Sequence, residues 1–466
     1  MSKSEAAYRA AARPAARLAA MCLMAACLLS CGKPAPDPAP RNLVLIVVDT
    51  LRQDRNGCYG HPRPTSPALD ALAAQGTLFR NAYTVSPWTL PSMASIFTGL
   101  YPGRHGVTAF REILPQEAPT LPEILERNGF ASAGVVSNVL LKREYGFARG
   151  FQRFDESQAV GHRNVSTGPV TDFAGSYLRR LAEQGDRFFL FVHYFDPHYR
   201  YQRHPMFGWS SDGAGRLDGG EAIQKIRAMD PLPSPEEVDF LVDCYDEEIA
   251  WTDRGVRRLL RQLDALGLSD DTIVVFTSDH GEEFLSRGWL GHTNSLYDEL
   301  MRVPLVVRDP RHAARVEQRP TSVVGVTPTV LELLGVSADA EFQGESFAGG
   351  VTGGESDWSD ELLLEVDFHP DSEQNDDKRA TLQGLRRDDW KIVRDTTTDD
   401  RLLFDLERDP LERQDRTGEE AERAEEMTRA LAARAAWAAR GALTPDSLEV
   451  DESQHERLRA LGYVGN

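Results

Sequence analysis

The chain has 466 residues and a formal net charge of −20 at pH 7. Apolar residues make up 41% and charged residues 27% of the sequence, which is typical of a globular protein and excludes a disordered chain. The negative charge excludes a general attraction to nucleic acid or anionic lipid, and we find no nucleic-acid motif. An anionic substrate would therefore need local positive charge, such as a metal ion.

The first thirty residues have the pattern of an export signal. A basic segment precedes an apolar run from Leu18 to Leu29, which is too short to span a membrane stably. The sequence Leu28-Leu29-Ser30-Cys31 then resembles a bacterial lipoprotein box, in which Cys31 carries the lipid. We therefore expect a signal peptide over 1–30 and a Pro-rich linker over 31–40. The protein would be exported and membrane-anchored through Cys31, facing the periplasm or the cell exterior. The alternative is a plain secretory signal with an incidental cysteine.

Residues 41–335 have the pattern of an α/β catalytic domain. Asn42 to Val48 is an unbroken apolar run, which predicts a strand buried on both faces of a parallel sheet. Phe188 to His193 and Thr272 to Thr277 are similar runs, and the second follows a helical pattern of about twenty residues. Strands that alternate with helices predict a large, mostly parallel sheet flanked by helices.

The pattern changes after about residue 335. Short strands separated by polar loops predict a smaller antiparallel sheet over 336–415, and 416–466 is predicted to be a helical C-terminal tail. The expected strands are Glu361 to Val366, Trp390 to Val393 and Leu402 to Phe404, and the expected helix is Glu419 to Ala439.

Polar side chains follow several of the predicted buried strands. Asp49 ends the first strand, Asp196-Pro197-His198 follows the second, and Asp279-His280 follows the third. In open α/β sheets, ligands bind beyond the carboxyl ends of the strands. Carboxylates and an imidazole that converge there suit a divalent cation. Taken singly, each aspartate could be a helix cap and each histidine a structural residue.

Thr89 lies just before a predicted helix. Pro91 occupies a position typical of a first helical turn, so we expect Thr89 just outside the helix N-terminus. Free N–H groups and the helix dipole favour an anion there, and a nearby metal would make the hydroxyl a usable nucleophile. The alternative is that Thr89 only caps the helix.

A series of short motifs follows one order along the chain. They are Val48-Asp49-Thr50, Tyr59-Gly60, Thr65-Ser66-Pro67, Pro91-Ser92, Thr98-Gly99, Tyr101-Pro102, Arg104-His105-Gly106-Val107, Thr277-Ser278-Asp279-His280-Gly281-Glu282, Gly291-His292, Tyr297-Asp298-Glu299, Arg302-Val303-Pro304, Thr327-Pro328-Thr329, Phe404-Asp405-Leu406 and Asp409-Pro410. In this order they resemble the sulfatase family of the alkaline phosphatase superfamily. The resemblance covers roughly residues 41–412 and implies the fold and the metal dependence of that family.

The resemblance also implies roles for individual residues. The nucleophile position is Thr89, and His198 matches a histidine that contacts the substrate ester. His292 stands where many members have a lysine that binds the ester oxygens. The positions that match family metal ligands are Asp49, Asp279 and His280.

The departures from the family pattern bear on the chemistry. Sulfatases convert a cysteine or serine into formylglycine, but Thr89 cannot give that aldehyde, so no formylglycine is expected. Thr50 replaces the second of two adjacent aspartates, so the cation could be Mn²⁺ or Zn²⁺ as well as the Ca²⁺ that the family favours. The usual mid-chain lysine and histidine are not identifiable, and Ser137-Asn138 stands near their expected place.

We therefore predict a metal-dependent hydrolase of the sulfatase family that acts on a sulfate ester or phosphoester. The substrate would be a sulfated or phosphorylated glycan, lipid or small molecule. A threonine nucleophile also fits a phosphodiesterase or a phospho-group transferase, similar to phosphoglycerol and phosphoethanolamine transferases. A further alternative is a non-catalytic, lipid-anchored binding protein.

Overall fold

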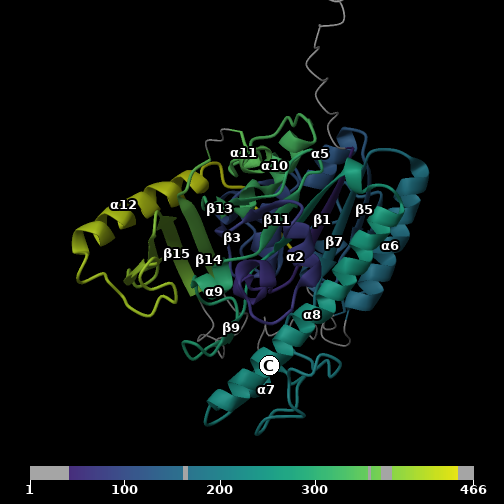
Figure 1. Ribbon diagram of the computed structural model, residues 1–466. Helices are drawn as coiled ribbons and strands as arrows, with labels where there is room; N and C mark the ends of the chain where they lie inside the picture. Colours follow the sequence, from purple (N-terminus) through teal and green to yellow (C-terminus); the bar gives the residue numbers. More distant parts are fainter. Residues whose placement is uncertain (1–40, 161–165, 355–357, 369–379, 450–466) are drawn as a thin grey trace, which may run out of the picture. The chain divides into compact units, whose positions relative to one another are not determined.

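The computed structural model describes residues 41–160, 166–354, 358–368 and 380–449 (Figure 1). The expected signal peptide, Cys31 and the linker lie outside these residues and stay predictions, as do the domain boundaries at 335 and 415. Among the described helices, none is both long and apolar enough to cross a membrane.

An eight-stranded sheet forms the centre of the fold. Its strand order is β12-β2-β11-β8-β1-β7-β5-β6, and every neighbouring pair is parallel except the two pairs made by β11. The predicted large, mostly parallel sheet is thus confirmed. The strands are β12 (Arg315–Glu317), β2 (Thr77–Phe79), β11 (Leu305–Arg308), β8 (Thr272–Ser278), β1 (Asn42–Val48), β7 (Phe188–Tyr194), β5 (Ala131–Val135) and β6 (Arg153–Asp155).

Helices cover both faces of this sheet. Alternate side chains of each strand point to opposite faces, and on the central strands both sets are apolar and need burial. Along β1, Leu43, Leu45 and Val47 pack into one apolar layer, while Val44 and Ile46 pack into the other. The first layer includes residues of α3 (Thr89–Thr98), α5 (Leu121–Arg127) and α10 (Val326–Leu333). The second includes α2 (Pro67–Ala73), α6 (Thr167–Gln184) and α8 (Pro235–Ala265).

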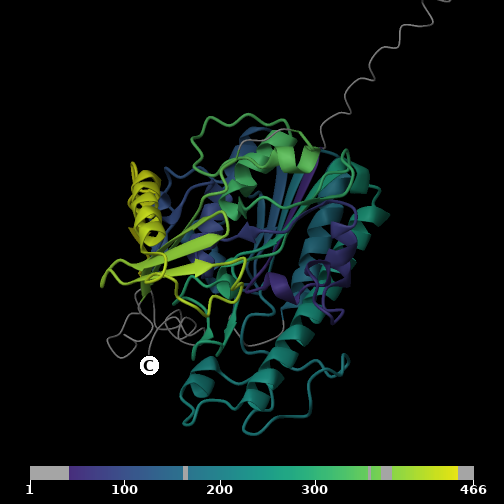
Figure 2. The same ribbon diagram turned by 60° about the vertical axis from the view of Figure 1, so that its left-hand side comes forward.

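A second, antiparallel sheet lies in the C-terminal part, with α12 across it (Figure 2). Leu363, Leu385, Ile392 and Leu403 share an apolar cluster with Leu431 of α12. The small antiparallel sheet is therefore confirmed. Its strands are β14 (Leu362–Phe368), β15 (Ala380–Arg387), β16 (Trp390–Asp395) and β17 (Arg401–Asp405), and the helix is α12 (Ala421–Ala438).

Short α-helices and two-residue strands lie between or after these elements, besides several 3₁₀ turns. They are the helices α4 (Pro102–His105), α7 (Ile223–Arg227), α9 (Asp298–Met301) and α11 (Ala348–Thr352), and the two-residue strands β3 (Ala82–Tyr83), β4 (Glu112–Ile113), β9 (Glu283–Phe284), β10 (Leu290–Gly291), β13 (Thr321–Ser322) and β18 (Asp446–Ser447).

Three local predictions were wrong. The helix before β8 has 31 residues instead of about twenty, because Ser234 and Glu237 form a capping box that starts it early. The small sheet has a strand, β15, that the pattern did not indicate. Thr89 is the first residue of α3 and not the residue before it, since Trp88 occupies the N-cap.

Candidate active site

The six predicted site residues come from five separate segments and meet at the carboxyl ends of the central strands. Asp49 directly follows β1, and Asp279 directly follows β8, its parallel neighbour. Thr89 begins α3, His198 follows β7 by four residues, and His292 directly follows β10. All of these side chains are buried, with at most 3% exposed.

His280 links the two aspartates to the threonine. Its Nε2 atom lies 3.7 Å from Asp49 Oδ1 and 3.5 Å from Asp279 Oδ2. The same nitrogen lies 3.3 Å from the Thr89 hydroxyl. The hydroxyl is thus beside the acidic pair, as the predicted mechanism requires.

Asn138 is a second link between these groups. Its side-chain amide donates hydrogen bonds to Asp49 Oδ2, at 2.7 Å, and to the Thr89 hydroxyl, at 3.3 Å. Sequence reasoning placed Ser137-Asn138 near the missing lysine and histidine without giving it a role. The amide can hold the threonine oxygen in place, but it cannot supply the positive charge of a lysine.

The histidines form a connected row toward the threonine. Ring centroids are 4.5 Å apart for His280 and His292, and 5.0 Å apart for His198 and His292. Glu282 orients His292, because its Oε1 lies 2.9 Å from His292 Nδ1. Burial lowers the pKa of both His198 and His292 well below the usual value, so these imidazoles are neutral at pH 7.

Asp196, in contrast, points away from this site. Its carboxylate accepts hydrogen bonds from the backbone N–H groups of Ser166 and Thr167, at the start of α6. Asp196 therefore caps that helix. This is the structural role that the sequence left open for each aspartate after a strand.

The acidic pair carries the features of a cation site. Burial and the neighbouring Asp279 raise the pKa of Asp49 well above its usual value. Asp49 Oδ1 and Asp279 Oδ2 have no hydrogen-bond partner within the described chain. Buried carboxylate oxygens without partners are costly, and a bound cation would satisfy them. The residues present therefore fit a metal ion.

His193 joins this group, although the sequence did not single it out. Atoms of Asp49, His193 and Asp279 lie within 4.8 Å of one another and could together hold a metal ion. His193 stands near the end of the apolar run that predicted β7, where it reads as a core residue. Its position beside β1 appears only in the register, which pairs Val47 with His193.

Thr50 has a strained backbone that serves the same site. Its φ is 53°, which is unfavourable for a β-branched residue. In this conformation its N–H donates to Asp279 Oδ1 at 3.2 Å, while its carbonyl accepts from the Tyr245 hydroxyl at 2.6 Å. The turn after β1 is thus fixed by groups from β8 and α8.

Arg227 brings positive charge to the edge of the site. Its Nε donates to the Leu290 carbonyl at 2.8 Å, and its guanidinium stacks on Trp289 at 4.2 Å. The φ of Gly291 is 108°, which favours glycine, and a Cβ there would come within 2.4 Å of the guanidinium. Arg227 therefore packs directly against the residue that precedes His292.

Comparisons with known proteins match most of the chain. The sulfatase family model matches residues 41–336, and the model for the N-sulphoglucosamine sulphohydrolase C-terminal region matches 287–436. Human N-sulphoglucosamine sulphohydrolase is 29% identical over 63% of this chain and 60% of its own length. The ulvan-active sulfatase of Formosa agariphila is 26% identical over 67% of this chain and 65% of its own length. The chain thus spans less than two thirds of each of these relatives.

A solved structure supports the fold. The phosphonate monoester hydrolase of Agrobacterium radiobacter superposes with a TM-score of 0.71 at 23% identity, covering 89% of this chain and 98% of that one. The family match extends over more than half of the chain and includes Asp49, Thr89, Asp279 and His280. The chain therefore belongs to the sulfatase family, within the alkaline phosphatase superfamily.

Proposed function

We propose that this protein is a metal-dependent hydrolase of anionic esters, with Thr89 as its nucleophile. The observation that carries the proposal is the position of the Thr89 hydroxyl, 3.3 Å from both His280 Nε2 and Asn138 Nδ2 and beside the buried aspartates. Asp49, Asp279 and His280 would hold the cation. When bound, the cation would neutralise the two carboxylates and lower the pKa of the hydroxyl.

In the first step, Thr89 Oγ1 forms a bond to the phosphorus or sulfur of the ester, and the bond to the leaving oxygen breaks. The hydroxyl loses one proton and the leaving oxygen gains one. His198 and His292 are neutral imidazoles whose rings adjoin His280, the histidine that contacts Thr89, so they suit this proton transfer. Water then bonds to the phosphorus or sulfur, the bond to Thr89 Oγ1 breaks, and a proton from the water passes to Oγ1, which restores the hydroxyl.

Threonine favours a phosphorus substrate over a sulfate ester. It cannot form formylglycine, so the elimination that releases sulfate from that residue is not open to this enzyme. Displacement by water is more accessible for phosphoryl transfer, in which positioning and charge do most of the work. A phosphoester or phosphonate monoester is therefore the first substrate class to test, and a sulfate ester is the second. The anionic group would face the positive charge of Arg227.

We also propose that the protein is exported and held at the membrane through Cys31.

The test is turnover of three aryl esters that share one leaving group: a phosphate diester, a phosphonate monoester and a sulfate. Each is assayed with added Mn²⁺, Zn²⁺ or Ca²⁺ and again with a chelator. We expect metal-dependent release from at least one phosphorus ester and slower release from the sulfate. If the protein holds metal but cleaves none of them, the hydrolase proposal fails for these classes. If it also purifies without metal, the non-catalytic binding protein becomes the better description.

A further inference from the structure

His193 is a buried histidine whose ring nitrogens make no hydrogen bond within the described chain. The side chain is 0% exposed, and neither Nδ1 nor Nε2 makes a hydrogen bond to the described residues. Its Nε2 lies 3.7 Å from Asp49 Oδ2, which is beyond hydrogen-bonding distance. A buried polar ring with no partner costs free energy, so a purely structural role does not account for a histidine here.

The sheet register explains why His193 faces the acidic pair. His193 on β7 lies beside Val47 on β1, and Thr277 on β8 lies on the other side of Val47. Side chains in register on parallel strands share a face, and residues two apart along a strand share it too. Asp49 and Asp279 come two residues after Val47 and Thr277, so His193 lies on the face of the sheet that carries both aspartates.

We propose that His193 is a ligand of the cation. It would take the place of the second family aspartate, whose position is occupied here by Thr50. This inference rests on the metal site of the proposed function. The adjacent pair of aspartates that the family resemblance implies is reduced here to Asp49 and Thr50. The Thr50 hydroxyl is buried and makes no hydrogen bond within the described chain, and a neutral hydroxyl does not supply the negative charge of a carboxylate. An imidazole from the neighbouring strand fills that role.

The resulting donor set contains two carboxylates and two imidazoles. His280 Nε2 lies 3.7 Å from Asp49 Oδ1 and 3.5 Å from Asp279 Oδ2, and His193 Nε2 lies 3.7 Å from the second Asp49 oxygen, Oδ2. Ligand atoms that share one ion at bond lengths of about 2.1 Å are separated by roughly 3 to 4 Å, so these spacings suit a common ion. Ca²⁺ takes oxygen ligands, whereas imidazole favours Zn²⁺ and related transition metals. The centre therefore selects Zn²⁺ over Ca²⁺.

The experiment measures metal binding and not turnover. The full-length protein is stripped with a chelator and titrated with Zn²⁺ or Ca²⁺ in a calorimeter, and His193→Ala is treated in the same way. We expect the variant to lose about 100-fold or more in Zn²⁺ affinity, with little change for Ca²⁺. The control is His204→Ala, since His204 stacks on Trp251 with the ring centroids 5.1 Å apart and is not one of the proposed ligands. Equal Zn²⁺ affinity in the wild type and His193→Ala would overturn the proposal.

A second measurement does not depend on the folding of a variant. X-ray absorption of the zinc-loaded wild type counts imidazole ligands, and we expect two. A count of one, or a stripped protein that binds Ca²⁺ more tightly than Zn²⁺, would also overturn the inference.

His193→Asp provides the opposite change, since a third carboxylate should shift the preference toward Ca²⁺.

Failure of this inference and failure of the proposed function give different results. Zinc held by two imidazoles in a protein that cleaves none of the three esters rejects the hydrolase and leaves the ligand assignment intact. Metal-dependent cleavage in a protein whose Zn²⁺ affinity does not change in His193→Ala does the reverse. Repeating the titrations in the Thr89→Ala background removes any contribution from turnover.

Discussion

Two regions of the described chain bury charged side chains in different ways, and in only one of these two do the charges pair with one another. In the candidate active site, Asp49 and Asp279 each have a carboxylate oxygen without a hydrogen-bond partner in the described chain. At the junction between the small sheet and α9, the Lys391 ammonium is 0% exposed but lies 2.7 Å from Asp298 and also pairs with Glu412. It donates a further hydrogen bond to the Leu296 carbonyl.

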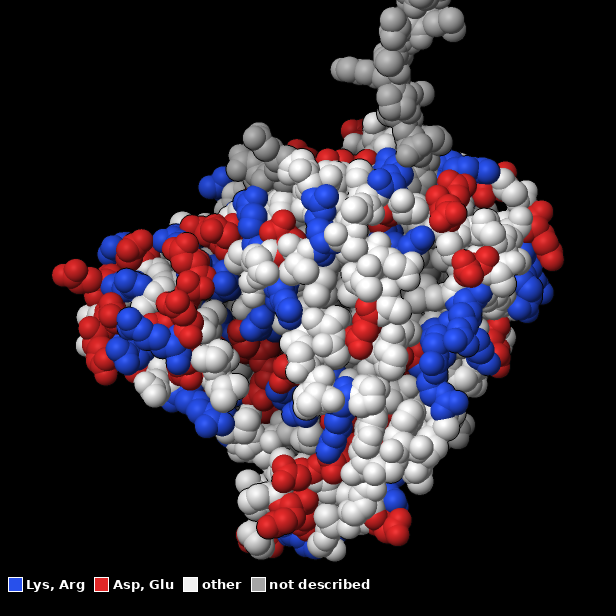
Figure 3. Space-filling view, in the orientation of Figure 1, with Lys and Arg blue, Asp and Glu red and all other residues white. Residues whose placement is uncertain are grey.

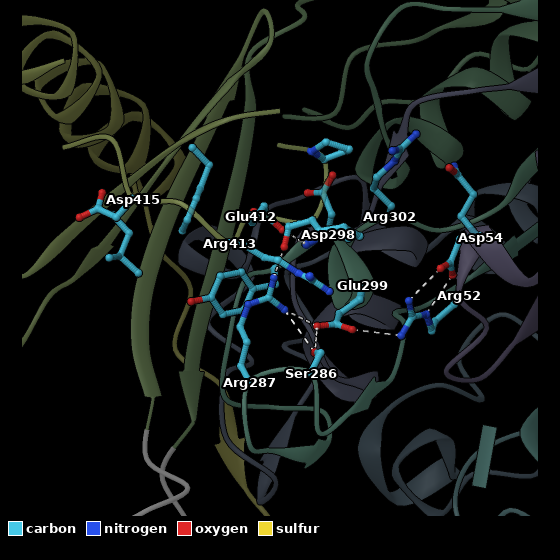
Figure 4. A pocket seen from close by; sticks show the side chains of 16 residues that line it. Arg52, Asp54, Ser286, Arg287, Asp298, Glu299, Arg302, Glu412, Arg413 and Asp415 are labelled. Atoms are coloured by element: carbon cyan, nitrogen blue, oxygen red, sulfur yellow. Dashed lines mark hydrogen bonds and ion pairs between the residues drawn. The ribbon is translucent and has the colours of Figure 1, made fainter. Parts of the chain in front are cut away.

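The same pairing continues along a cavity of about 860 Å³ beside this junction. There Glu299 lies between Arg52, at 3.1 Å, and Arg287, as Figure 4 shows. The acidic side chains that gather in the recess beside α9 in Figure 3 belong to this cavity. Burial alone would lower the pKa of Lys391, but its two carboxylate partners raise it above the usual value.

The difference separates structure from function. A buried charge that has partners holds two parts of the fold together and needs nothing more. A buried charge without partners lowers the stability of the folded protein. It is retained where a bound ligand pairs with the charge and removes that penalty. The junction is therefore assigned to stability and the strand-end cluster to chemistry.

The largest effect is expected from Thr89→Ala, because it removes the proposed nucleophile without touching the acidic pair. Turnover should fall by about 1,000-fold or more, while metal content stays at the wild-type level. Steady-state kinetics and elemental analysis measure the two quantities. The matched control is Thr98→Ala in the same helix. Its hydroxyl donates to the backbone carbonyl of Ala94 and accepts from the N–H of Leu100, away from the proposed site. An active Thr89→Ala enzyme would show that the hydroxyl merely belongs to the first helical turn.

Lys391→Met tests the other region. The variant leaves Asp298 and Glu412 buried without their cation, so the free energy of unfolding should fall by about 3 to 5 kcal/mol. Denaturant unfolding, followed by circular dichroism, measures the loss. Arg394→Met is the control, because its ion pair with Asp399 is partly exposed and should contribute less than about 1 kcal/mol. Similar losses in the two variants would contradict the structural role of the junction.

Much of the fold could be predicted because its central strands are continuous apolar runs. β1, β7 and β8 each begin where predicted, and Asp49 and Asp279 stand at the ends of two of them. The predicted starts of two helices, α3 and α8, were wrong. The first turn of α3 follows Trp88, whose side chain makes no capping hydrogen bond, so nothing in the sequence marks that boundary. The start of α8 did carry a signal, the capping box of Ser234 and Glu237.

The residues that were missed depend on pairing between distant segments. His193 reads as part of an apolar strand, and only its neighbour on β1 reveals that it faces Asp49. Asn138 contacts Asp49 across 89 positions of sequence, and Arg227 reaches the residue before His292 from a separate short helix. Local periodicity contains no information about such contacts, so the family motifs located the site but not its full lining.

The smallest expected effect gives the sharpest comparison, because one substitution type should act with opposite signs in the two regions. Asp49→Asn removes one of two neighbouring buried carboxylates that lack a counter-charge, so the metal-free protein should gain about 1 to 2 kcal/mol of stability. Asp298→Asn removes a partner of Lys391 and should destabilise the protein by a similar or larger amount. Thermal unfolding in the presence of a chelator measures both. Added Zn²⁺ should then stabilise the wild type more than Asp49→Asn, since binding to the folded state raises stability with ligand affinity. If Asp49→Asn instead weakened the metal-free protein, Asp49 would have a protein partner that satisfies its charge, and the argument for a cation at the strand ends would lose its main support.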